Sequence, residues 1–175
     1  ELDLPQNVID LLVNEWNITR LHPPQAEALP VALSGENLLL AIPTASGKSL
    51  VAYLAIIQRI LVDKPGSRAF YLVPLKALAS EKVEELREAG ESLGFTVGMA
   101  VGDRAGETVS LDQADVIVAT SEKFDSLMRN RDGFLSQVSI VVADEVHLIH
   151  DQSRGPTMEV NLARVKHERP DAQII

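Results

Sequence analysis

Short apolar runs alternate with longer amphipathic stretches along most of this chain, and this alternation strongly constrains its fold. The runs at 69–73, 115–119 and 138–143 are almost continuously apolar. Strands of this kind are buried on both faces, as happens in parallel sheets that carry helices on each side. We therefore predict an α/β domain in which a parallel sheet has helices on both faces.

The remaining elements follow from the same patterns and from turn residues. Further strands are predicted at 37–42, 96–101 and 172–175, and helices at 5–12, from 23 to 33, and at 48–61, 76–93, 121–129 and 155–167. Ser121 is predicted to cap the helix that it opens. Ligands of such folds bind beyond the carboxyl ends of the strands. The loops that should carry function therefore follow Ile42, Val73, Val101, Ala119 and Ala143.

Composition excludes several classes of protein. The 175 residues suffice for about one domain, and 46% of them are apolar, which is enough to build a core. Cysteine is absent, so a disulfide scaffold, a thiolate zinc site and a cysteine nucleophile are ruled out. The formal net charge of −9 argues against coating nucleic acid by bulk attraction. Any nucleic-acid contact must therefore be local.

The ends of the chain suggest a piece of a larger protein. It opens on Glu1 rather than Met and stops at Ile175 within an apolar run. It has no cationic leader with a cleavage site, so we expect a cytoplasmic protein, or a nuclear one in a eukaryote.

A phosphate-binding loop is predicted between the strand at 37–42 and the helix that follows. Gly-Lys-Ser opening a helix directly after a strand surrounds phosphate oxygens with backbone N–H groups. The lysine supplies a point charge to the β- and γ-phosphates, and the serine hydroxyl can bind Mg²⁺. An ordinary turn with a helix-starting lysine is the alternative. The predicted nucleotide contacts are Thr44, Ala45, Ser46, Gly47, Lys48 and Ser49.

An acidic pair, Asp144 and Glu145, follows the apolar run at 138–143. Carboxylates at the end of a buried strand are costly unless a cation pairs them. Mg²⁺ held by Asp144 would do so, and Glu145 would then deprotonate the attacking water. A solvent-exposed helix cap is the alternative. A zinc site at His147 and His150 is disfavoured, because no further ligand stands at a suitable spacing.

Together these motifs resemble motifs I and II of a superfamily 2 DExH-box helicase. Other segments resemble further motifs in the same order: the adenine-reading Q motif at 21–29, motif Ia at 71–82, motif Ib at 101–103 and motif Ic at 119–127. The segment 154–159 is similar to the helix start after motif II. The residues of these motifs are most similar to those of the Ski-two-like group, and within it to archaeal DNA helicases related to the polymerase theta helicase domain. Ile42 and Ser49 depart from the residues usual in that group.

This resemblance implies that residues 1–175 form the first of two RecA-like, P-loop motor domains, from an archaeal-type cell. Gln25 would then hydrogen-bond the adenine of ATP, while Lys48, Asp144 and Glu145 would form the catalytic set. Mg²⁺ would be held by Ser49 and Asp144. The loops at the strand ends would hold the backbone of a single or forked DNA strand. The residues expected to contact that strand are Pro74, Lys76, Gly102, Thr120, Ser121 and Arg154.

The function that follows is an ATP-dependent DNA helicase or translocase, with 3′-to-5′ polarity and a role in fork or recombination repair implied by the resemblance alone. An RNA helicase of the same group is an alternative, because nothing in the sequence reports on the 2′-hydroxyl. A nucleotide-binding regulatory domain without turnover and a phosphate-loop kinase are others. The second motor domain would supply the arginines that meet the γ-phosphate, so the isolated chain should be nearly inactive.

Overall fold

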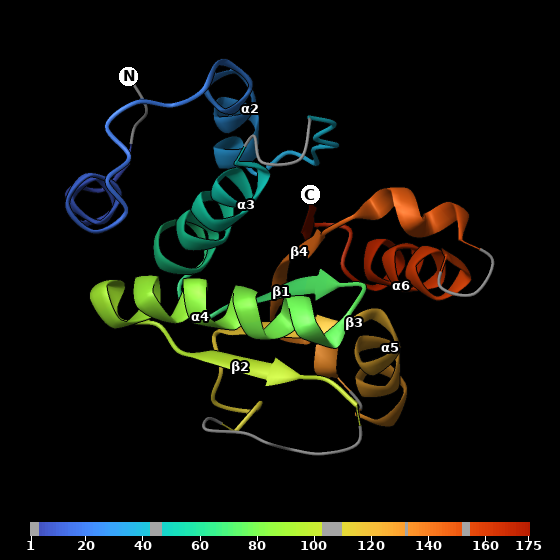
Figure 1. Cartoon of the computed structure of the whole chain (residues 1–175). Coiled ribbons are helices and arrows are strands. Elements are labelled where there is room, and N and C mark those ends of the chain that lie inside the picture. Colours follow the sequence, from blue (N-terminus) through green and yellow to red (C-terminus); the bar gives the residue numbers. More distant parts are fainter. Residues whose placement is uncertain (1–3, 43–46, 103–109, 132, 152–154) are drawn as a thin grey trace.

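A five-stranded parallel sheet forms the centre of the molecule (Figure 1). The computed structural model describes residues 4–42, 47–102, 110–131, 133–151 and 155–175. The strand order is β2-β3-β1-β4-β5, and all neighbouring pairs are parallel. The α/β class predicted from the sequence is thus confirmed. The strands are β1 (Arg68–Val73), β2 (Val97–Ala100), β3 (Val116–Thr120), β4 (Val138–Ala143) and β5 (Gln173–Ile174).

Helices precede, connect and cover these strands. The α-helices are α1 (Gln6–Asp10), α2 (Pro23–Ser34), α3 (Lys48–Ile57), α4 (Lys76–Leu93), α5 (Ser121–Asn130) and α6 (Gly155–Glu168). Two π-helical turns, η1 (Leu11–Glu15) and η2 (Gln58–Asp63), extend α1 and α3. Two short 3₁₀ helices are η3 (Phe134–Gln137) and η4 (Val146–His150). The helix predicted at 48–61 therefore loses its regular α-helical pattern in its last turn.

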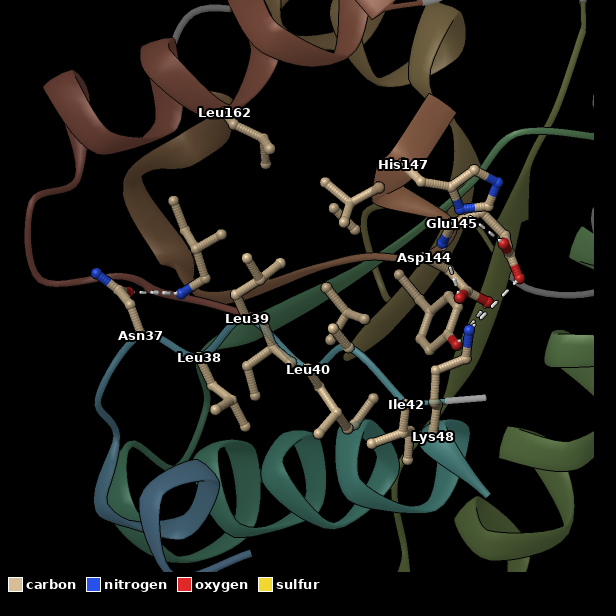
Figure 2. Close-up of a pocket in the computed structure, with 18 of the residues that line it drawn as sticks. Asn37, Leu38, Leu39, Leu40, Ile42, Lys48, Asp144, Glu145, His147 and Leu162 are labelled. Atoms are coloured by element: carbon tan, nitrogen blue, oxygen red, sulfur yellow. Dashed lines mark hydrogen bonds and ion pairs between the residues drawn. The ribbon is translucent and has the colours of Figure 1, made fainter. Parts of the chain in front are cut away.

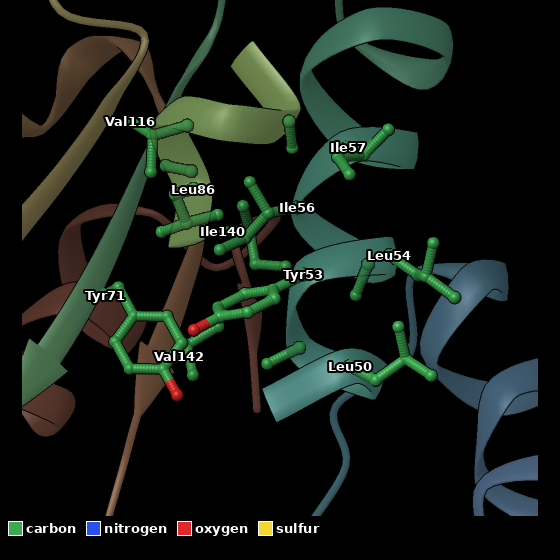
Figure 3. Close-up of a cluster of buried hydrophobic side chains, with 14 of the residues drawn as sticks. Leu50, Tyr53, Leu54, Ile56, Ile57, Tyr71, Leu86, Val116, Ile140 and Val142 are labelled. Atoms are coloured by element: carbon green, nitrogen blue, oxygen red, sulfur yellow. The ribbon is translucent and has the colours of Figure 1, made fainter. Parts of the chain in front are cut away.

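Alternate residues of β1 pack into two separate cores, as the period of two in a strand requires. Tyr71 joins a core built with α2, α3 and α4, whereas Phe70 joins one built with α5 and α6. The ring of Phe70 lies 4.7 Å from that of Phe124 on α5. On the opposite face, Tyr53 of α3 lies against Tyr71 (Figure 3). Burial of both strand faces explains why the sequence runs are continuously apolar.

The segment 37–42 is not a strand, contrary to the sequence prediction. It lies beside β5, where the Leu38 N–H donates to the Ile174 carbonyl and the Asn37 side chain accepts from the Ile174 N–H. Because β5 spans only Gln173–Ile174, the neighbouring strand is too short to support a regular ladder. The side chain of Leu39 is consequently 76% exposed.

The cap of α5 also differs from the prediction. Thr120, not Ser121, is the N-cap, and its hydroxyl accepts from the Lys123 N–H at 3.4 Å. Ser121 begins the helix itself and is buried, and Asn161 of α6 donates to its carbonyl. The strand runs one residue further than expected, so the extended conformation that a cap needs falls on Thr120.

Within the described ranges, the helices are all too short or too polar to cross a membrane.

Gln173 of β5 connects the end of α2 to the sheet by hydrogen bonds. Its side chain is buried, and its amide nitrogen donates to the carbonyls of Ala32 and Glu36 at 2.8 and 2.7 Å. A buried carbonyl that loses its donor keeps its desolvation cost. This side chain therefore holds together two segments that are far apart in sequence.

Replacing Gln173 with Leu should lower the free energy of unfolding by about 2 kcal/mol, because two carbonyls lose their donor while side-chain volume is kept. Urea unfolding of the chain measures this. The matched control is Gln137→Leu at an exposed position, which should change stability by no more than about 0.5 kcal/mol. Equal effects of the two substitutions would contradict the assigned role of Gln173.

Candidate functional site

The predicted lysine and acidic pair meet at one edge of the sheet. Lys48 is the first residue of α3, and Asp144 and Glu145 directly follow β4. The Lys48 ammonium lies 3.9 Å from Glu145 Oε1 (Figure 2). Both side chains are about 30% exposed, at 29% and 30%. Elements about 100 residues apart in sequence thus form one partly open charged site, as the sequence predicts.

Glu145 is held in an unusual backbone conformation between two cationic or polar partners. Its φ of 55° lies in the left-handed region, which few residues other than glycine adopt. Besides the contact with Lys48, its Oε2 lies 3.2 Å from His147 Nδ1. Strained residues persist where the surrounding structure fixes them, and they concentrate at functional sites. The conformation aims the Glu145 carboxylate at Lys48.

Asp144 uses both carboxylate oxygens within the protein. Its Oδ1 accepts from the Glu145 N–H at 2.9 Å, and its Oδ2 accepts from the Tyr71 hydroxyl at 3.0 Å. Tyr71 was not among the predicted site residues. The one available signal was a tyrosine inside an otherwise apolar strand, since a buried tyrosine hydroxyl generally finds a partner.

Gln25 reaches the start of α3. Its side-chain nitrogen donates to the Gly47 carbonyl at 3.1 Å, and its side-chain oxygen accepts from the His22 N–H at 2.8 Å. Gly47 has a φ of 72°, and a Cβ there would meet the Gln25 nitrogen at 2.1 Å. The backbone conformation therefore favours glycine at this position, and a Cβ there would displace the Gln25 side chain from the Gly47 carbonyl. The structure ties the predicted adenine-binding glutamine to the predicted phosphate loop.

A cleft of about 720 Å³ opens at this edge and has two chemically different ends (Figure 2). Lys48, Asp144 and Glu145 line the polar end. Leu39 and Leu162 lie toward the other end, which is mainly apolar, with Asn37 as a polar residue there. Charged phosphates and a cation suit the polar end only.

The donors at the polar end fit a magnesium–phosphate group. No cluster of three or more His, Asp or Glu side chains that could hold a metal occurs in the part of the chain that the structure describes. Mg²⁺ needs no such cluster, because it keeps waters and is usually bound by one or two carboxylates together with phosphate oxygens. Asp144 supplies such a carboxylate, and the Lys48 ammonium at the same end of the cleft can neutralise phosphate oxygens.

Some of the residues predicted to contact nucleic acid lie at the same edge of the sheet. Beyond β1, Pro74 is half-buried and Lys76 is exposed. Gly102 is exposed beyond β2, and Thr120 is half-buried at the end of β3. Ser121 differs, because its hydroxyl is sealed from solvent and makes no hydrogen bond within the described residues. In this conformation the Ser121 hydroxyl is out of reach of a strand. Arg154, which was also predicted to contact the strand, lies outside the described residues, as do Thr44, Ala45 and Ser46 of the predicted phosphate loop.

Solved structures of helicases share this fold. A Saccharomyces cerevisiae Dbp5 variant bound to RNA and ADP BeF3 has a TM-score of 0.83 and 23% identity, covering 99% of this chain and 44% of its own. The DUF1998 helicase MrfA bound to DNA has a TM-score of 0.77 and 22% identity, covering 98% of this chain and 26% of its own. At these identities the likeness concerns the fold alone.

Curated relatives are much more similar in sequence. The ATP-dependent DNA helicase Hel308 of Methanocella arvoryzae is 48% identical over 180 aligned residues, and that of Pyrococcus horikoshii is 46% identical over 176. Each alignment covers 100% of this chain but 24% of the relative. The chain thus spans about a quarter of the length of these relatives.

The family model for the DEAD/DEAH box helicases matches residues 22–175, which include both the lysine loop and the acidic pair. With the fold, the site geometry and the relatives in agreement, this chain belongs to the DEAD/DEAH box helicase family.

Proposed function

We propose that this chain is the first RecA-like, ATP-binding motor domain of an ATP-dependent DNA helicase. The observation that carries the proposal is the meeting of Lys48 with Asp144 and Glu145 at the carboxyl edge of a parallel sheet. Relatives from five archaeal species, 41–48% identical to the chain, are named ATP-dependent DNA helicases, which supports DNA as the substrate. The remainder of the motor, including a second RecA-like domain, would come from other parts of the parent protein.

The residues of the polar edge divide the nucleotide chemistry among them. Lys48 would neutralise phosphate oxygens, together with backbone N–H groups of the loop that includes Thr44, Ala45 and Ser46. Ser49 and Asp144 would hold Mg²⁺, which, when bound, draws charge from the phosphate oxygens.

Glu145 would accept a proton from the attacking water. In the structure its carboxylate is occupied by Lys48 and His147. Phosphate bound at Lys48 would compete for the same ammonium and leave Glu145 free to act. Gln25 would bind adenine from its place beside Gly47.

A nucleic-acid strand would lie across the ends of β1, β2 and β3, contacting Pro74, Lys76, Gly102 and Thr120. Lysine, hydroxyl and backbone N–H groups bind phosphates without reading bases. Ser121 and Arg154 were assigned to the same surface from sequence. The proposal for Ser121 requires that its buried hydroxyl become exposed when the strand binds.

Substituting Lys48 with Ala in the full-length protein should weaken nucleotide binding at least about tenfold, because a charged contact to phosphate is lost. Fluorescent-nucleotide titration measures this effect. Lys64→Ala is the matched control, since Lys64 pairs with Asp171 near the amino ends of the strands. Nucleotide affinity that survives the loss of Lys48 would refute the predicted phosphate site.

Glu145→Gln should leave nucleotide affinity nearly intact and lower the ATPase rate by about a hundredfold or more, because general-base catalysis is removed. Steady-state turnover in the full-length protein tests this, with Glu88→Gln on the exposed side of α4 as control. An unchanged turnover rate would show that Glu145 is not the base.

ATPase activity of the full-length protein should be stimulated by single-stranded DNA more strongly than by RNA of the same sequence. Lys76→Ala should raise the DNA concentration needed for half-maximal stimulation several-fold. It should also reduce the slope of log binding constant against log salt concentration by about one, which corresponds to one lost phosphate contact. Preferential stimulation by RNA would instead assign the protein to RNA unwinding. Lys64→Ala again serves as the control.

A further inference from the structure

A buried tyrosine on the central strand contacts the predicted magnesium ligand. Tyr71 is 1% exposed, and its hydroxyl donates to Asp144 Oδ2 at 3.0 Å. The strand register explains the contact. Tyr71 pairs with Val142, and Asp144 lies two residues further along the same chain, on the same side of the sheet. A tyrosine side chain is long enough to span that distance along the strand direction.

The contact fixes the rotation of the Asp144 carboxylate. Its other oxygen accepts from the Glu145 N–H at 2.9 Å, so each oxygen has one hydrogen bond from the protein. A carboxylate has about four lone-pair sites, which leaves acceptor positions on both oxygens for a cation or its waters. The two hydrogen bonds therefore set where those positions point.

The second predicted magnesium ligand belongs to the same group of side chains. Burial raises the pKa of both Tyr71 and Tyr53, and Ser49 acts on each of them in the opposite direction. The ring centroids of the two tyrosines are 5.8 Å apart (Figure 3). The Tyr53 hydroxyl donates to Glu85 of α4, which also accepts from Lys82 at 3.2 Å.

We propose that Tyr71 is a positioning residue whose hydroxyl orients the Asp144 carboxylate and so sets the affinity of the site for the divalent cation that accompanies the nucleotide. This inference rests on the proposed function of the site. Ring packing alone does not require a hydroxyl at this position, because phenylalanine would fill the same space against Tyr53. The hydroxyl is thus the part of the side chain that the apolar core leaves unexplained.

The test compares nucleotide affinity with and without metal in the full-length protein. A fluorescent N-methylanthraniloyl-ADP is titrated in the presence of Mg²⁺ and again with EDTA, and the ratio of the two affinities reports the metal contribution. Tyr71→Phe should reduce that ratio about tenfold, as expected for a lost hydrogen bond to a charged group, and leave the metal-free affinity unchanged. An unchanged ratio overturns the proposal.

Ser139→Ala is the matched control, because it also removes a buried hydroxyl from a hydrogen bond. Ser139 lies on β4, near the end opposite Asp144, and its hydroxyl is 2.7 Å from that of Ser67. The ratio of nucleotide affinities with and without Mg²⁺ should be the same for Ser139→Ala as for the wild type. A drop as large as that of Tyr71→Phe would mean that lost stability, and not positioning, explains both. Failure of the wild type to bind nucleotide would instead refute the proposed function.

A second measurement covers the case in which Tyr71→Phe does not fold. Incorporating 3-fluorotyrosine at position 71 keeps the ring and the hydroxyl and adds a fluorine-19 signal beside Asp144. Adding Mg²⁺ to the nucleotide-bound protein should shift that resonance, because the hydrogen-bonded carboxylate would take on the cation. A resonance that does not move on addition of Mg²⁺ would contradict the proposal.

Discussion

The parallel pairing of β1 with β4 is the constraint on which the rest of the site depends. It places Tyr71 beside Val142 and so brings Asp144 and Glu145 to the edge where α3 begins with Lys48. Parallel strands all end at the same edge, so the loops beyond β1, β2 and β3 meet there too. A shift by one residue in this register would turn Asp144 to the other face of the sheet and separate it from Lys48.

Positively charged side chains lie at this edge although the chain as a whole is acidic. The chain has a net charge of −9, yet the acidic pair lies beside Lys48 and His147, and the exposed Lys76 follows the neighbouring strand. The Lys48–Glu145 pair is partly solvent-exposed, so it adds little stability and can be broken cheaply by a competing anion. Such a pair keeps both groups near their working positions without locking them. The αL backbone of Glu145 serves the same end by directing its carboxylate toward Lys48.

Buried side chains hold the surroundings of the site together, whereas its charged groups are partly exposed. Gln25 connects α2 to Gly47, Gln173 connects α2 to β5, and the two tyrosines join α3 and β1. Each of these side chains is buried and carries a polar group, so an arrangement that pairs that group is favoured over alternatives that leave it unpaired. The apolar half of the cleft has a different character. There the extended segment 37–42 exposes Leu39 beside the short strand β5.

Residue patterns along the chain predict the α/β class, the order of most elements and the meeting of Lys48 with the acidic pair. These follow from apolar periodicity, from turn residues and from the rule that parallel strands end at one edge, all of which are local or topological. Three features come from long-range packing instead: the contact of Tyr71 with Asp144, the placement of Gln25 against Gly47 and the burial of Ser121 beside α6. Long-range packing also decided that 37–42 is no regular strand. Each of these depends on strand register or on a neighbour distant in sequence, which residue patterns along one segment do not encode.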